Sequence, residues 1–224
     1  MRKLNSISIL LTAIAVLFVS CGGNKSKAGS NNNETADYSS IVVTYANTVD
    51  MMGVKTTTNE TIWNDLENNR KATYTTTETI FMGQNTKEET LQIEDGDWGY
   101  NINLKDKTGT KGNIKEMKEM AMAMAGALAM SGDLKDLKSL KDFVEKSGGK
   151  MLPNETILGK ECTVYEVMGS KQWLYKGMVL KATMGDKVIM NAVKVEEDVN
   201  IPDDKFKIPE GITITEAPAM PEMN

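Results

Sequence analysis

The 224-residue sequence contains no histidine and only two cysteines. Without histidine there is no imidazole base near neutral pH, which excludes Ser-His-Asp and Cys-His catalysis and His-ligated zinc or haem. Two cysteines are too few for a thiolate-only zinc or iron–sulfur site within one chain. Positive charge is also scarce, since 26 Lys and Arg stand against 31 Asp and Glu, and the net charge of −5 argues against a nucleic-acid partner.

The N-terminal hydrophobic run is too short to cross a membrane as a helix. Ile7–Val19 has 13 residues without a charge, whereas a membrane span needs about 20 apolar residues. With Arg2 and Lys3 before it, the run has the proportions of a secretory signal peptide. The residues that follow, Leu17-Phe18-Val19-Ser20-Cys21, resemble the lipobox of bacterial lipoproteins. That resemblance implies that residues 1–20 are removed and that Cys21 is acylated, including with palmitate-like chains.

An acylated Cys21 predicts where the protein resides. Each buried methylene contributes about 0.8 kcal/mol, so two or three acyl chains hold a protein on a membrane almost permanently. Loss of Arg2 and Lys3 would leave the mature chain at −7, so the anchor must come from the lipid. We expect a lipid-anchored protein of the cell envelope, at the outer membrane. Gly22–Lys25 lacks an acidic run that marks surface export in some lineages, which favours the periplasmic face. The other cysteine, Cys162, lies in a strand pattern and is predicted to be a small buried hydrophobe.

Composition divides the chain into four parts. Residues 1–20 are the predicted signal peptide. Residues 21–38 are rich in Gly, Ser, Asn and Lys and are predicted to form a flexible tether. Residues 39–215 have the size of a single domain. Residues 216–224 carry two prolines and no strand pattern, and are predicted to form a disordered tail.

Within the domain, strand patterns flank two helical patterns. Residues 40–104 are rich in Thr, Tyr, Ile and Val, with an Asp95-Gly96 hairpin signal, and strands resume from about residue 156 to 199. Between them, Asn113 begins an apolar stripe of helical spacing that ends near Met130, and Asp133 begins a second that ends near Ser147. This order predicts the α+β class with an antiparallel sheet.

The same order, together with the lipobox, resembles the LolA/LolB-like lipoprotein-carrier superfamily. The segments that carry the resemblance are Gly159–Tyr165, Trp173–Leu180 and Asp203–Gly211, within an order of elements that covers residues 40–212. The resemblance implies a curved antiparallel half-barrel, with the two mid-chain helices covering its concave face. It also implies a space between sheet and helices that can hold acyl chains.

Methionine is over-represented, with 16 residues, and several are predicted to face that space. Unbranched thioethers adapt to irregular ligands. The predicted lining of the cleft is apolar throughout, and it suits a lipid-like ligand: Met82, Trp98, Tyr100, Ile102, Met117, Met124, Leu128, Met178, Leu180 and Met184. The alternative is a filled core without a ligand, in a structural or accessory lipoprotein that acts through protein contacts.

Two further roles are disfavoured by geometry. Met117 and Met120 could share a Cu(I) ion on one helix face, but Met122 and Met124 diverge by about 200°. An acidic pair at the Asp95-Gly96 hairpin could imitate a glycosidase, but turn chemistry accounts for Asp95 and adjacent strand residues face opposite ways. We therefore expect a non-enzymatic protein with no cofactor and no metal, whose protein partner the sequence does not identify.

Overall fold

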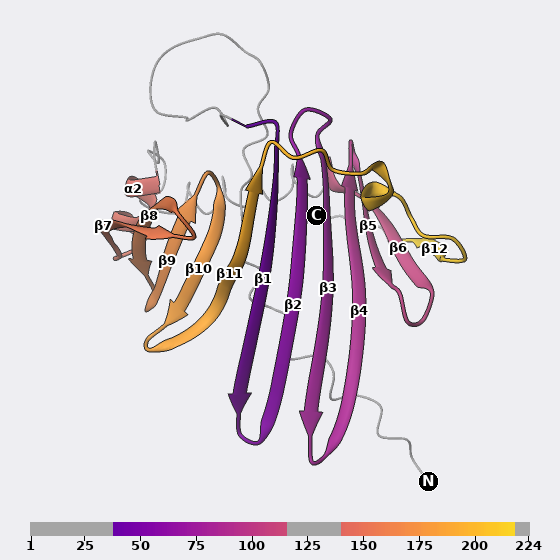
Figure 1. Ribbon diagram of the computed structural model, residues 1–224, viewed down its shortest axis with the longest axis horizontal. Helices are drawn as coiled ribbons and strands as arrows, with labels where there is room; N and C mark the ends of the chain where they lie inside the picture. Colours follow the sequence, from indigo (N-terminus) through magenta and orange to yellow (C-terminus); the bar gives the residue numbers. More distant parts are fainter. Residues whose placement is uncertain (1–37, 116–139, 218–224) are drawn as a thin grey trace, which may run out of the picture. The chain divides into compact units, whose positions relative to one another are not determined.

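The computed structural model describes residues 38–115 and 140–217, which belong to one compact unit, residues 36–224. These residues form one twelve-stranded sheet in the order β12-β6-β5-β4-β3-β2-β1-β11-β10-β9-β8-β7 (Figure 1). Every neighbouring pair is antiparallel except β12 with β6. The elements are β1 (Ser40–Met51), β2 (Val54–Asp65), β3 (Arg70–Phe81), β4 (Gln84–Asp95), β5 (Trp98–Asn103), β6 (Thr108–Asn113), α2 (Leu140–Lys146), β7 (Lys150–Ile157), β8 (Lys160–Val167), β9 (Ser170–Tyr175), β10 (Met178–Met184), β11 (Lys187–Glu197), the 3₁₀ turn η1 (Asp203–Phe206) and β12 (Thr213–Glu216).

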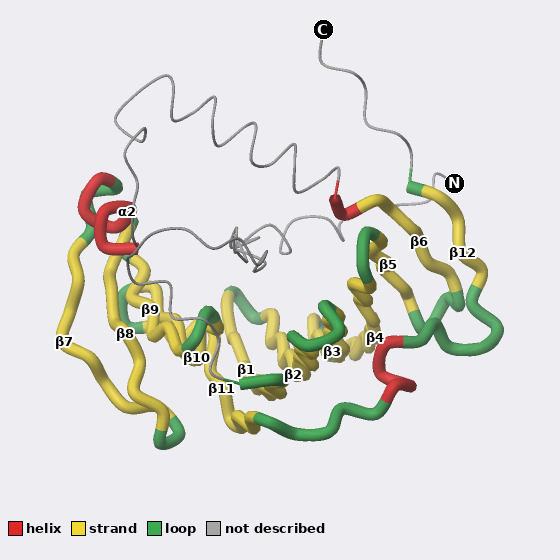
Figure 2. Tube along the Cα trace, turned by 90° about the horizontal axis from the view of Figure 1, so that it is seen from above, coloured by secondary structure: helices red, strands yellow, loops and turns green. Residues whose placement is uncertain are grey.

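The strands are joined mainly by tight hairpins, as their turn residues predict. The Asp95-Gly96 hairpin is confirmed, because β4 and β5 pair from Asp95↔Trp98 onward and Gly96 has a φ of 59°. Bulges interrupt the register between Thr44 and Tyr45 and between Val179 and Lys181. Bulges bend the strands that carry them, and the sheet is correspondingly curved when seen along its strands (Figure 2).

The two faces of the sheet are distinguished by residues that alternate along β1. Val42 packs with Ile201 and Phe206 of the C-terminal segment, which runs below the convex side (Figure 2). Val42 therefore points to the convex face, and its neighbours Ile41 and Val43 point to the concave face.

The hydrophobic core changes face along the sheet. On the concave side, Ile41 and Val43 pack with Cys162, Val164 and Leu180 of the curled strands β8 and β10. We call this group the concave core. The second core lies on the convex side of β2–β6, because its members share a face with Val42 in the strand register. This convex core consists of Val42, Ala72, Leu91, Ile93, Ile102, Ile201 and Phe206.

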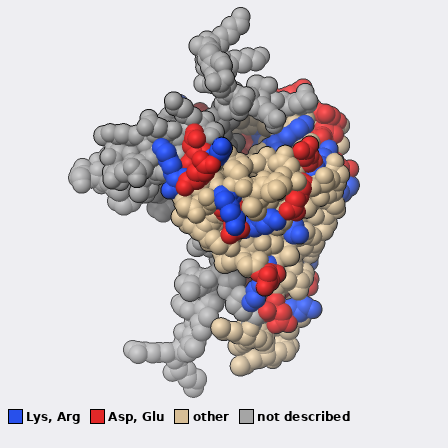
Figure 3. Space-filling model, turned by 90° about the vertical axis from the view of Figure 1, so that its left-hand side faces the viewer, with Lys and Arg blue, Asp and Glu red and all other residues tan. Residues whose placement is uncertain are grey.

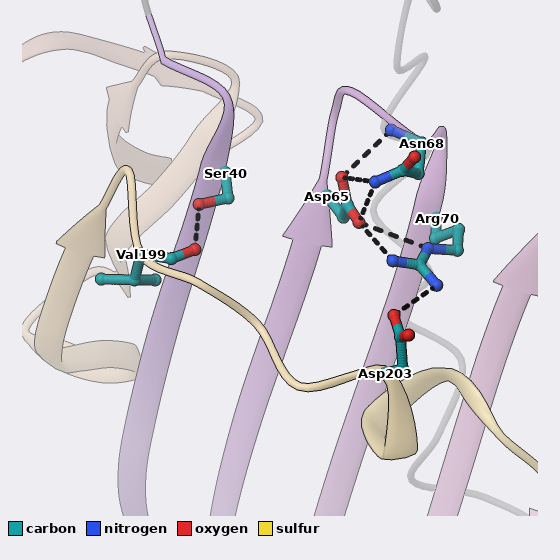
Figure 4. Close-up of polar contacts among 6 residues, drawn as sticks. All are labelled: Ser40, Asp65, Asn68, Arg70, Val199 and Asp203. Carbon is teal, nitrogen blue, oxygen red and sulfur yellow. Dashed lines mark hydrogen bonds and ion pairs between the residues drawn. The ribbon is translucent and has the colours of Figure 1, made fainter.

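The C-terminal segment is clipped onto the convex face by polar contacts (Figure 4). The Arg70 guanidinium contacts Asp65 at 2.7 Å and Asp203 at 3.0 Å, and it stacks over the Phe206 ring at 4.4 Å. The Ser40 hydroxyl donates to the Val199 carbonyl at 2.7 Å. These contacts place η1 over the convex core, so that Phe206 covers the apolar side chains there.

Strand β12 completes this cover at the edge of the sheet. Ile214 packs against the convex core and lies opposite Gly109 of β6. A Cβ atom at Gly109 would lie 2.8 Å from Cδ1 of Ile214 and 3.0 Å from the Asn101 carbonyl oxygen, so the missing side chain of glycine favours this close approach.

The predicted α+β class, with two helices over the concave face, is wrong. The described residues are mostly β, and α2, with seven residues, is their one α-helix of that length. It packs against β7 and β8 at one end of the sheet rather than over its centre. The first predicted helix lies almost entirely outside the described residues, although the Lys115 amide donates to Asn113 at 3.0 Å, as a cap would require.

The error has a physical cause in the edge strands. Strands β6, β7 and β12 lack a regular apolar alternation, and β6 reads Thr-Gly-Thr-Lys-Gly-Asn. They pair because the adjacent edge offers unpaired backbone groups, which side-chain patterning does not record. None of the helices in the described ranges is long and apolar enough to cross a membrane.

Candidate functional site

The residues predicted to line one cleft lie in four different places. Met117, Met124 and Leu128 fall outside the described residues. Met178 and Leu180 belong to the concave core, where Leu180 is fully buried. They are the two predicted residues that the described structure brings together on the concave side.

Three of the predicted residues lie on the convex face instead. Ile102 and Tyr100 pack in the convex core. Trp98 shares their face, is 40% exposed, and has the Lys111 ammonium 3.7 Å above its ring. The alternation correctly groups these side chains, but it does not say which face of the sheet is concave.

The last two predicted residues lie at hairpin ends. Met82 is 84% exposed in the β3–β4 turn, with a φ of 49°. Met184 is 50% exposed at the end of β10. Both lie at the far ends of their hairpins, Met82 in the turn itself and Met184 as the last residue of β10, where their side chains are largely exposed.

The concave face of β1–β5 carries a row of polar side chains that the prediction missed. Tyr45, Glu60, Thr75, Thr90 and Asn103 lie directly opposite one another across five strands, and opposite residues share a face. We call them the polar row. The Thr75 hydroxyl donates to the Glu60 carboxylate at 3.2 Å. The signal in the sequence was Glu60 within the threonine-rich strand β2, but a threonine-rich face is also typical of a sheet face that meets water.

The apolar end of this row is poorly hydrated. Burial raises the pKa of the Glu60 carboxyl above its usual value, against the opposing effects of the Thr75 hydroxyl and the Lys71 charge. Burial and then the Glu60 charge raise the pKa of Tyr45. The Tyr45 hydroxyl donates to the Val179 carbonyl at 3.0 Å, across the curve of the sheet. Glu60 therefore lies where ionisation is disfavoured.

Asn47 adds a buried acceptor next to the polar row. It lies two residues beyond Tyr45 on the same face of β1, opposite Thr58. Its Oδ1 atom is buried and has no hydrogen-bond partner in the part of the chain that the structure describes. A buried acceptor without a partner costs about 1–3 kcal/mol, so Asn47 offers an unused site for a donor.

A charged cluster lies at the C-terminal end of β11, around Glu197. Glu197 accepts from Lys160 at 2.7 Å and from the Tyr175 hydroxyl at 2.7 Å, and Lys176 lies 3.4 Å away. Burial opposes ionisation of Glu197, but these donors outweigh it and hold its pKa below the usual value. The cluster joins β11 to β8 and β9, and thereby stabilises the curl that encloses the concave core.

The thiol of Cys162 lies in the concave core. The residue is fully buried and unpaired, and burial raises the pKa of its thiol. The prediction of a small buried hydrophobe is confirmed, since a protonated thiol in an apolar core is unreactive.

Within residues 38–115 and 140–217, the structure contains no group of three or more Cys, Asp or Glu side chains that could hold a metal ion. The methionines considered for Cu(I), Met117, Met120, Met122 and Met124, lie outside these ranges. The acidic residues of the Asp95-Gly96 hairpin are strand-end and turn residues.

Comparison with known proteins identifies no family. No protein-family model matches the chain, and no curated protein matches it. Six chains of solved structures match. One of them, PNGF-II, is 12% identical with a TM-score of 0.32, over 80% of this chain and 32% of that one. The chain thus spans about a third of the length of PNGF-II, and the likeness is too low to inform function.

Proposed function

We propose that the protein is a lipid-anchored protein of the bacterial cell envelope, at the periplasmic face of the outer membrane, that binds an amphipathic, lipid-like ligand without covalent chemistry. The anchor rests on the sequence ending in Cys21. The ligand site is the concave face of the sheet between the concave core and the polar row. The observation that carries ligand binding is the unpartnered, buried Oδ1 atom of Asn47 beside this row.

The two sides of this face favour the two ends of one amphipathic molecule. The concave core is bordered by the partly buried side chains of Ile62 on β2, Met178 on β10 and Met190 on β11. They suit an acyl chain, because thioethers and branched aliphatic groups adapt to apolar ligands. Toward β2–β5, hydroxyl and amide groups suit a polar group. Since the Asn47 Oδ1 atom only accepts hydrogen bonds, the matching group carries an O–H or N–H donor.

Ligand binding is tested by native mass spectrometry of the full chain, purified from membranes in mild detergent. We expect a reproducible lipid adduct that added lysophospholipid displaces. The informative variant is Asn47→Leu, which removes the acceptor at nearly constant volume. The matched control is Asn59→Leu, the same substitution at an exposed position of β2 on the convex face.

The expected result is a loss of adduct by at least about tenfold in Asn47→Leu and none in Asn59→Leu, because tenfold corresponds to 1.4 kcal/mol, the scale of one hydrogen bond. A protein that carries no adduct and ignores added lysophospholipid would refute ligand binding. It would favour the alternative of an accessory envelope lipoprotein that acts through protein contacts.

The anchor has an independent test. Cys21→Ala removes the acylated atom and should release the protein from the membrane fraction, with a lower mass in intact-protein spectrometry. Retention of Cys21→Ala on membranes at wild-type levels would refute the anchor.

A further inference from the structure

The hairpins β1–β2 and β3–β4 extend beyond their neighbours in the sheet. β1 pairs with β11 only over Ile41–Tyr45, and β4 pairs with β5 only over Thr90–Asp95. The pairing of β1 with β2 and of β3 with β4 continues to the turns. The four strands therefore project about 20 Å further, at roughly 3.3 Å per residue. We call this part the four-stranded extension (Figure 1).

The end of this extension is apolar and exposed. Met52 is 95% exposed and Met82 is 84% exposed, and next to them Phe81 and Ile80 are each more than 40% exposed. Val54 lies opposite Phe81 in the register. Scattered apolar side chains are normal on a protein surface, but a cluster at one projecting end marks an interaction site. We call these five residues the apolar tip.

The turn conformation makes the methionines unfavourable for folding alone. Met52 and Met82 have φ values of 53° and 49°, each followed by a glycine. Two-residue turns of this kind favour Asn or Asp before the glycine, and long side chains are disfavoured at positive φ. Asn69, in the β2–β3 turn at the opposite end of the same strands, has a φ of 52°. The fold therefore accepts asparagine at positive φ. Leu158 and Met168 also precede glycines at a φ of 51° in other hairpins, so it is the exposure of Met52 and Met82 together at one projecting end that points to a role outside folding.

The tip carries no charge. Residues 51–54 and 80–84 contain no Asp, Glu, Lys or Arg, and the lower end of the described surface shows none in the view of Figure 3. The nearest charged residues on the four strands are Asp50, Lys55, Glu78 and Lys87, which balance. The tip therefore avoids the repulsion from an anionic surface that the net charge of −7 expected for the anchored chain imposes elsewhere.

We propose that the apolar tip inserts into the surface of the lipid bilayer. This goes beyond ligand binding, and it rests on the proposed function only for the anchor that supplies the membrane. The 17 residues from Cys21 to Asp37 span at most about 60 Å. β1, with 12 residues, is about 40 Å long. A chain anchored at Cys21 can therefore reach the start of β1 while the far end of β1 lies at the same bilayer.

The insertion is tested with the full chain reconstituted in vesicles of phosphatidylethanolamine and phosphatidylglycerol. Met82→Cys is labelled with an environment-sensitive fluorophore, and the matched control is Asn69→Cys, a turn residue with a similar positive φ at the opposite end. Cys162 is buried, and the unsubstituted chain measures the background from Cys21. We expect a blue shift and at least threefold stronger quenching by spin-labelled lipids at position 82 than at position 69.

A second variant separates insertion from mere proximity. Met52→Ser with Phe81→Ser, in the Met82→Cys chain, should abolish the excess quenching while circular dichroism stays unchanged. Equal quenching at positions 82 and 69 would overturn the proposal. A blue shift at position 82 without lipid quenching would also overturn it, because a protein, a second copy or another partner would then cover the tip. Release of Cys21→Ala from membranes reports on the anchor separately.

Discussion

The two halves of the sheet bury opposite faces. In β8–β11 and the start of β1, the concave face is apolar because the sheet curls over it and covers Ile41 and Val43 with its own strands. In β2–β6 the convex face is apolar because the C-terminal segment covers Ala72 and Ile102 from outside. The concave face of that second half is thereby left to polar groups. The proposed site for a polar group lies where the fold needs no core.

The largest loss of stability is expected when one fully buried side chain is truncated in each core. Ile41→Ala in the concave core and Ile102→Ala in the convex core remove fully buried side chains, so each should lower the free energy of unfolding by about 2–5 kcal/mol. Because the two clusters lie on opposite faces without shared partners, the double variant should be additive within about 0.5 kcal/mol. Urea unfolding measures this, with the exposed Ile80→Ala as the control. A strong non-additivity would show that the two halves share one core.

A smaller effect is expected from the clip that covers the convex core. Arg70→Ala removes the contacts with Asp65 and Asp203 and the stacking on Phe206. Since Arg70 is partly exposed, the loss should be about 1 kcal/mol. Amide exchange should rise in the segment around η1 and not in β8–β10. Lys105→Ala, at an exposed turn position, should change neither; faster exchange throughout the sheet in Arg70→Ala would contradict a local clip.

The two faces of the sheet should also differ in the sign of their pH dependence, and β2 carries one titrating carboxyl group on each face. Burial opposes ionisation of Asp65, but hydrogen bonds from Arg70 and Asn68 outweigh it and lower its pKa. The ionised Asp65 therefore stabilises the fold at pH values above its unfolded pKa of 3.8. This stabilisation is lost as the pH falls through the lower pKa that Asp65 has in the folded protein. Asp65→Asn should therefore reduce the loss of stability in acid.

Glu60 on the concave face should behave in the opposite way. Its folded pKa is raised above 4.5 by burial, so its stabilisation is present below 4.5 and is lost as the pH rises through the folded value. Glu60→Gln should raise the urea midpoint at neutral pH and leave it nearly unchanged in acid. A lower midpoint at neutral pH would mean that the carboxylate has a stabilising partner.

The smallest effect is expected at the apolar tip, where a substitution should increase the free energy of unfolding rather than lower it. Met82→Asn replaces a long side chain at a φ of 49° by the residue that this conformation prefers. The free energy of unfolding should rise by a few tenths of a kcal/mol, up to about 1. At Asn69, Asn69→Met should lower it by a similar amount. Destabilisation by Met82→Asn would show that the methionine supports the fold itself.

Several elements were predictable from local chemistry. The hairpin at Asp95-Gly96, the long strands around Ile41 and Ala72, and the burial of Cys162 follow from turn propensity and from alternation. The fold class and most of the site were not predictable in the same way. Strand β6 is glycine-rich and β12 is four residues long, and they become strands by pairing with edges that form elsewhere in the chain.

The predicted cleft failed for a related reason. Alternation correctly placed Tyr100 with Ile102, and spacing grouped Met178 with Leu180, but it assigned all of them to one face. The polar row was overlooked because threonine alternation has the same appearance whether a face meets water or a ligand. Met82 was misplaced because a strand pattern does not mark the residue at which the turn begins.

Side-chain alternation and turn chemistry act over a few residues, so the sequence by itself determines which residues share a strand face and where hairpins reverse. It also shows directly that a lipobox-like cysteine follows the N-terminal apolar run. Which face is buried depends on what covers it, and the covering segments lie far away in the chain. Cys162 reaches Ile41, and Phe206 reaches Ala72, over more than a hundred residues. Only the assembled sheet decides that Glu60 and Asn47 face one concave surface while Ile102 faces away from it.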